Sequence, residues 1–145
     1  MGKGIVPQCA RCRRKECRDG KDCFSQTPRH RPLYHNDVAK LHQAASAIEG
    51  RYYGKETRLG EIMLFAKELG YQRIGLAFCI GLSEEAQIIE SILSNHFEVV
   101  SVCCKVCGID KKDFGLQQIS SQNDEVMCNP AGQASCSMRR RLSSM

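Results

Sequence analysis

Apolar residues recur with the period of a helix in the first half of the chain and gather into short continuous runs after residue 72. In residues 37–49 they are spaced three and four positions apart, which places them on one face of a helix. Residues 57–69 repeat that spacing, and Gly50 and Gly70 follow the two segments. Because glycine is favoured just past a helix end, the pattern predicts two amphipathic helices.

The short continuous apolar run at residues 73–79 is typical of a buried strand. Residues 97–102, rich in β-branched side chains, predict a second strand. The segment between them, residues 83–96, has helical spacing and carries Glu84 and Glu85 in its first turn, where negative charge suits the helix dipole. A strand, a helix and a strand within about thirty residues form a βαβ unit, whose strands are parallel. We therefore predict an α/β fold: a small parallel sheet built on a βαβ unit and preceded by two helices.

The two ends of the chain lack such patterns. Residues 9–32 carry eight Lys or Arg against three acidic residues, and they have too few apolar side chains to fold by burial alone. The sequence thus predicts a cysteine-rich metal-binding arm at 1–35, an α/β domain at 36–134 and a disordered tail at 135–145. Two recognisable strands make a small sheet, so we expect the α/β domain to be incomplete.

Composition places the chain among globular proteins: 145 residues, 42% hydrophobic and 26% charged, with a formal charge of +5. No apolar run approaches the roughly 20 residues of a membrane span. The N-terminus also lacks the apolar segment of a secretory signal. We therefore predict a cytoplasmic protein without membrane association. In that reducing compartment ten cysteines are expected to be ligands or reactive thiols rather than disulfides.

Four of the cysteines lie within fifteen residues, with the spacing Cys-x2-Cys-x4-Cys-x5-Cys. A Cys-x2-Cys pair lets two thiolates of one turn reach the same ion, and nearby Arg and Lys favour the thiolate form. Zinc or a [4Fe–4S] cluster fits such a set, although the spacing matches neither a zinc ribbon nor the ferredoxin run. Redox thiols and incidental cysteines are the alternatives. The predicted metal ligands are Cys9, Cys12, Cys17 and Cys23.

The basic residues of the arm raise the alternative of a zinc knuckle that binds nucleic acid. Such binding depends on exposed aromatic side chains for base stacking, and only Phe24 and Tyr34 lie nearby. We therefore disfavour nucleic acid as a partner and interpret the basic residues as a solvated surface around an anionic metal–thiolate centre.

A second group of cysteines follows the two predicted strands. Cys79 ends the first strand and the pair Cys103-Cys104 ends the second, while Cys107 and Cys128 follow. Parallel strands bring their carboxyl ends to one edge of the sheet, where open α/β sheets bind ligands. Packing as a small apolar side chain is the preferred interpretation for Cys103 alone. The predicted cofactor-binding residues at this edge are Cys79, Cys104, Cys107 and Cys128.

Four motifs together resemble a known family. They are the N-terminal cysteine spacing, residues 75–82 (GLAFCIGL), residues 102–108 (VCCKVCG) and residues 127–130 (MCNP). The chain resembles the cysteine-rich family of anaerobic prokaryotes labelled domain of unknown function 1847, or simply metal-binding protein. The resemblance spans residues 9 to about 134 and implies metal binding without an established reaction. Members continue with a further helix and strand, so the departure after Ala134 predicts a truncated or frameshifted end.

We expect a metal-binding protein with a redox or electron-transfer accessory role, acting with a redox partner protein. Two alternatives remain open. One is a zinc-stabilised binding module without catalysis, and the other is a thiol–disulfide oxidoreductase that uses Cys104 and Cys107. No motif of the Walker or GxGxxG type supports nucleotide binding. The sequence assigns no substrate.

Overall fold

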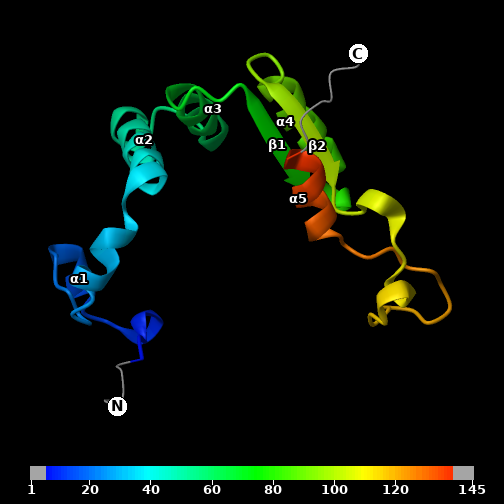
Figure 1. Cartoon of the computed structure of the whole chain (residues 1–145), viewed down its shortest axis with the longest axis horizontal. Coiled ribbons are helices and arrows are strands. Elements are labelled where there is room, and N and C mark those ends of the chain that lie inside the picture. The colour runs from blue at the N-terminus through cyan, green and yellow to red at the C-terminus, as the bar shows by residue number, and fades with distance from the viewer. Residues whose placement is uncertain (1–5, 139–145) are drawn as a thin grey trace. The chain divides into compact units, whose positions relative to one another are not determined.

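A computed structural model of the protein describes residues 6–138 (Figure 1). The chain forms two compact units, one up to Thr57 and the other from Arg58 onward. In the described part of the chain, no helix combines the length and the apolar character that a membrane crossing requires.

The first unit consists of short turns followed by one long helix. None of residues 6–35 is buried. The helix α2 buries Ala44 and Ile48, and it continues past Gly50, where the sequence predicted its end. The left-handed glycine that follows α2 is Gly54, with φ 68°. The elements of this unit are η1 (Cys9–Arg11), η2 (Glu16–Asp19), α1 (Thr27–His30), η3 (Arg31–Leu33) and α2 (Asn36–Tyr52).

The second unit is built on the predicted βαβ arrangement. Strands β1 (Arg73–Phe78) and β2 (Glu98–Cys103) pair in parallel, with Arg73 opposite Glu98 and Phe78 opposite Cys103. Helix α4 (Ser83–Leu93) connects them. The α/β fold class and the small parallel sheet predicted from the sequence are therefore confirmed.

Helix α3 (Arg58–Glu68) precedes the sheet and ends at a glycine, as predicted. Gly70 has φ 71°; its amide donates to the Lys67 carbonyl (3.0 Å), and the Tyr71 amide donates to the Ala66 carbonyl (2.9 Å). This pair of bonds closes the helix end in a Schellman motif. The core of the unit then forms where α3 and α4 meet one face of the sheet. Its buried residues are Ala66, Leu93 and Phe97, with Leu59, Met63, Ile74, Ile89 and Val99 packed against them.

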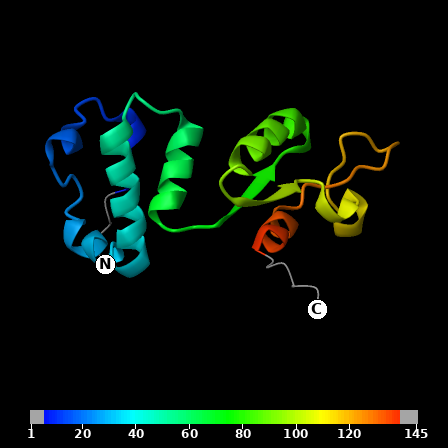
Figure 2. The ribbon, with the colours of Figure 1, turned by 90° about the horizontal axis from the view of Figure 1, so that it is seen from above.

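The opposite face of the sheet is covered by α5 (Pro130–Met138), as Figure 2 shows for the strands between α4 and α5. The contact is close because β1 presents Gly75, where an added Cβ would lie 3.0 Å from the Cβ of Ser137. Residues 135–138, which the sequence predicted to begin a disordered tail, belong to α5 instead. The side chains of α5 are mostly small, so the sequence shows no apolar face that would have predicted this helix. Residues 139–145 of the predicted tail lie outside the described residues.

Two turns and a long loop separate β2 from α5. They include η5 (Val106–Gly108) and η6 (Lys111–Phe114), and η4 (Ile80–Leu82) follows β1. The loop is closed by an antiparallel bridge between Asp110 and Val126. These connections carry the cysteines at the carboxyl edge of the sheet.

Candidate thiol sites

The N-terminal cysteines lie on a loop whose backbone faces one of the thiols. Cys9 begins the turn η1 and Cys12 follows it, and the Cys12 amide donates to the Cys9 carbonyl (3.2 Å). Backbone N–H groups of Lys15 and Arg14 donate to the Cys12 sulfur and hold the pKa of Cys12 below its usual value. The geometry depends on Lys15, which adopts a left-handed φ of 52°. These backbone groups favour the thiolate of Cys12, which is the form of cysteine that binds metal.

Two lysines add positive charge to this loop. The Lys15 ammonium donates to the Cys9 carbonyl (2.6 Å), and the Lys21 ammonium pairs with the Glu16 carboxylate. Glu16 raises the pKa of Lys21, and the Cys23 and Cys12 thiolates raise it further. Lys21 thus lies in the field of two of the four predicted ligands.

All four predicted N-terminal ligands are exposed. Across residues 6–138, no three or more His, Cys, Asp or Glu side chains are grouped closely enough to hold a metal ion. The role of Cys9, Cys12, Cys17 and Cys23 as ligands therefore stays a prediction.

At the sheet edge, backbone bonds place Cys104 directly beside the end of β1. The Cys104 amide donates to the Phe78 carbonyl (2.8 Å), and the Ile80 amide donates to the Cys104 sulfur (3.3 Å). Cys79 lies between those two residues of the β1 end. Cys104 is only 7% exposed, whereas Cys79 is exposed.

The Cys104 thiol meets two other cysteines. The Ile80 amide favours its thiolate, but burial and the thiols of Cys128 and Cys79 together outweigh that effect and raise the pKa of Cys104. Three of the four cysteines predicted for this edge therefore come together, from the end of β1, the end of β2 and the segment before α5.

Two residues that the sequence analysis did not single out position Cys128. Lys105 donates from its ammonium to the Cys128 sulfur (3.7 Å) and to the Val126 carbonyl (2.6 Å). The Asn129 amide donates to the Cys104 carbonyl (2.8 Å).

Asn129 also caps α5. Its side-chain oxygen accepts from the Gly132 amide (2.8 Å), and its side-chain nitrogen donates to the Val106 carbonyl (3.2 Å). An added Cβ at Gly132 would lie 2.5 Å from that nitrogen, so the cap requires glycine there. Asn followed by Pro130 is the cap signal available in the sequence.

The remaining cysteines of this region have other surroundings. Cys107 is exposed, lies on η5 and has φ 72°. The Cys103 sulfur accepts from the Lys105 amide (3.3 Å). The predicted thiol exchange between Cys104 and Cys107 stays a prediction.

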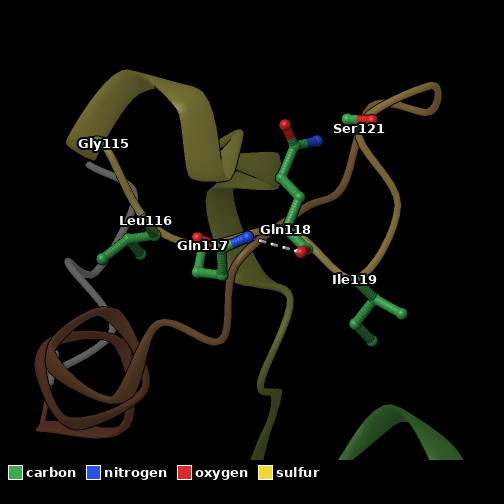
Figure 3. A pocket seen from close by; sticks show the side chains of 6 residues that line it. All are labelled: Gly115, Leu116, Gln117, Gln118, Ile119 and Ser121. Carbon is green, nitrogen blue, oxygen red and sulfur yellow. Dashed lines mark hydrogen bonds between the residues drawn. The ribbon is translucent and has the colours of Figure 1, made fainter.

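The loop after η6 contains an open hollow of about 370 Å³ (Figure 3). It is formed by residues of one loop, within which the Gln117 side chain donates to the Gln118 carbonyl (3.4 Å). The lining residues carry no ionisable side chain, and no cysteine is among them. They are Gly115, Leu116, Gln117, Gln118, Ile119 and Ser121.

The fold and the thiols define a cysteine-rich α/β protein. The chain belongs to the family described as "Protein of unknown function (DUF1847)", which matches residues 21–142. The resemblance stated from the four motifs is thereby confirmed. The chain is 47% identical over 129 residues to "Uncharacterized protein MJ0455" of Methanocaldococcus jannaschii, covering 88% of this chain and 67% of that relative. No solved structure matches the chain.

Proposed function

We propose that this chain is a metal-binding protein whose N-terminal cysteines, Cys9, Cys12, Cys17 and Cys23, hold one metal centre. The observation that carries the proposal is the spacing of these four cysteines, Cys-x2-Cys-x4-Cys-x5-Cys, on one short segment. The backbone N–H groups of Lys15 and Arg14, which lower the pKa of Cys12, support it. Hydrogen bonds to the charged form of an acid favour that form, so the turn stabilises a thiolate before any metal arrives.

The packing of the segment supports the same conclusion. Residues 6–35 contain no buried residue, yet they form defined turns. Fixing a backbone costs roughly 1–2 kcal/mol per residue, and apolar burial is what normally offsets that cost. A metal bound by four thiolates links distant positions of such a segment, and its binding free energy becomes folding free energy.

The four sulfur donors limit which metals the N-terminal site can hold. Four sulfur ligands suit zinc or an iron–sulfur cluster, and not a hard cation such as magnesium or calcium. A [4Fe–4S] cluster would give the protein an electron-transfer accessory role with a redox partner. Zinc would make the segment a structural element of a binding module without catalysis.

The test is metal analysis of protein purified without oxygen, together with its visible absorption spectrum. We expect Cys12→Ser to lose the N-terminal metal, while the control Cys136→Ser, on α5, keeps it. Iron with visible charge-transfer bands identifies the cluster and the redox role. Zinc with no visible absorption identifies the structural role. Equal metal content in Cys12→Ser and the wild type would overturn the proposal.

A further inference from the structure

We infer that Cys79, Cys104 and Cys128 form a second metal site, at the carboxyl edge of the sheet, for a thiophilic divalent cation such as zinc. This site lies in the second unit of the chain and shares no residue with the N-terminal centre. It therefore goes beyond the proposed function and does not depend on it.

Convergence is the first argument. Cys79 follows β1, Cys104 follows β2 and Cys128 precedes α5, so three separate segments deliver one thiol each. The Cys104 thiol interacts with both of the others. Packing of Cys104 as a small apolar side chain does not account for two further thiols beside it. Nor does it account for the Lys105 ammonium, which donates to the Cys128 sulfur.

The second argument is the set of donors around the sulfurs. The Ile80 amide donates to the Cys104 sulfur (3.3 Å), and the Lys105 ammonium donates to the Cys128 sulfur (3.7 Å). Three thiolates around a divalent ion carry a net charge of −1. The Lys105 ammonium offsets that charge, as outer-shell partners of metal ligands commonly do.

The third argument is rigidity of the backbone that carries the ligands. The Cys104 amide and carbonyl are both bonded, to Phe78 and to the Asn129 amide (2.8 Å each). The Gln133 side chain donates to the Phe78 and Val102 carbonyls (3.0 Å each), which ties α5 to both strand ends. All three ligand-bearing segments are thus anchored to one another.

Cys79 and Cys128 are exposed, whereas Cys104 is buried. In the described residues the three sulfurs are not yet grouped closely enough to hold an ion. Closing them on one requires rotation of the exposed Cys79 and Cys128 side chains about their χ1 angles. Three protein ligands leave one tetrahedral position of zinc for a water or a small anionic ligand. That position would face the solvent side, where Cys79 and Cys128 lie.

The experiment measures zinc-dependent protection of each cysteine. The full chain is reduced, incubated anaerobically with or without zinc, alkylated with iodoacetamide and mapped by peptide mass spectrometry. We expect zinc to slow alkylation of Cys79, Cys104 and Cys128 together. Cys79→Ser and Cys128→Ser should each abolish protection of the remaining two thiols, whereas the neighbouring control Cys103→Ala should retain it.

A Cys9→Ser/Cys12→Ser variant distinguishes the sheet-edge site from the N-terminal centre. In this variant zinc should still protect the sheet-edge cysteines. If zinc protects only the N-terminal cysteines, this inference is wrong and the proposed function stands. If zinc protects only the sheet-edge thiols, the proposed function fails and this inference stands.

Discussion

Cys12 is an exposed thiol whose ionisation is controlled by its own turn. The N–H groups of Lys15 and Arg14 lower its pKa. A lowered folded-state pKa means that the thiolate stabilises the turn above the unfolded pKa, and that this contribution is lost as the pH falls through the folded pKa. We predict that alkylation of Cys12 reaches half its maximal rate at a lower pH in the metal-free folded chain than in the urea-unfolded chain. Equal midpoints in a pH–rate profile, read by peptide mass spectrometry, would contradict this.

Lys105 is the charged residue that we assign to the sheet-edge metal. Its ammonium contacts the Cys128 sulfur, so its removal should leave a more negative and less well positioned thiolate. We predict that Lys105→Met weakens zinc binding at that edge by about tenfold, the lower end of typical outer-shell effects. Zinc competition with a chelator, followed through protection of Cys128, measures the change. Lys112→Met is the matched control, because Lys112 pairs with Asp124 instead. An equal loss of zinc affinity in both variants would show that Lys105 acts only through the net charge of the protein.

At the scale of elements, Gln133 is the link between α5 and the sheet. Its side-chain nitrogen donates to the Phe78 and Val102 carbonyls (3.0 Å each) from the face opposite α4. Gln133→Leu removes both bonds and leaves an apolar group against two carbonyls. We expect a loss of about 1–3 kcal/mol in the free energy of unfolding, measured with urea. Gln117→Leu, on the exposed loop, should change stability little; a comparable loss there would point to a non-specific effect of leucine.

The Glu125 carboxylate makes two contacts that hold the loop between η6 and α5. The Lys111 ammonium pairs with Glu125, the Ile119 amide donates to the same carboxylate (2.8 Å), and both lower the pKa of Glu125. The charged form therefore stabilises the loop above the unfolded pKa, about 4.3, and the contribution is lost as the pH falls through the lower folded pKa. We predict that hydrogen exchange at Ile119, corrected for the intrinsic effect of pH, loses protection in that acidic range. Glu125→Gln should remove the pH dependence; its persistence would assign the effect elsewhere.

The sequence was sufficient for the elements whose signals are local. The βαβ unit follows from an apolar run, a helix with acidic first-turn residues and a segment rich in β-branched residues, and the end of α3 follows from Gly70. Helix α5 could not be predicted in the same way, because its packing on the sheet uses small residues such as Ser137 against Gly75. That fit exists only once β1 and α5 are adjacent, 62 positions apart in the numbering.

The same distinction applies to the candidate thiols. Parallel pairing alone predicts that Cys79 and Cys104 share an edge of the sheet. The positions of Lys105 and Asn129 depend on bonds that span more than twenty residues, from Lys105 to Cys128 and from Asn129 to Cys104. In the N-terminal loop, no spacing rule reveals that Lys15 adopts a left-handed conformation and turns its amide toward Cys12.

At the scale of the whole molecule, the N-terminal cysteines and the sheet-edge cysteines lie in different compact units, and the boundary falls between Thr57 and Arg58. Residues 6–35 of the first unit contain no buried residue, whereas the second unit has its own core around Leu93 and Phe97. The proposed N-terminal metal therefore supports a segment that has little else to order it, while the sheet is held by apolar packing regardless of metal.

This difference in support predicts a difference in response to ligand removal. Compared with the wild type loaded with zinc or a cluster, the Cys9→Ser/Cys12→Ser variant should show faster amide hydrogen exchange throughout residues 9–23. The rate should approach that of an unfolded chain, because the segment without its metal is held by turns and surface ion pairs. Amides of β1 and β2 should keep their protection, since the core of the second unit is untouched. Cys79→Ser is the reciprocal control, and it should leave exchange in residues 9–23 unchanged. Loss of protection in β1 and β2 of the double variant would show that the two units fold as one, and full protection of residues 9–23 would show that the segment is ordered without its metal.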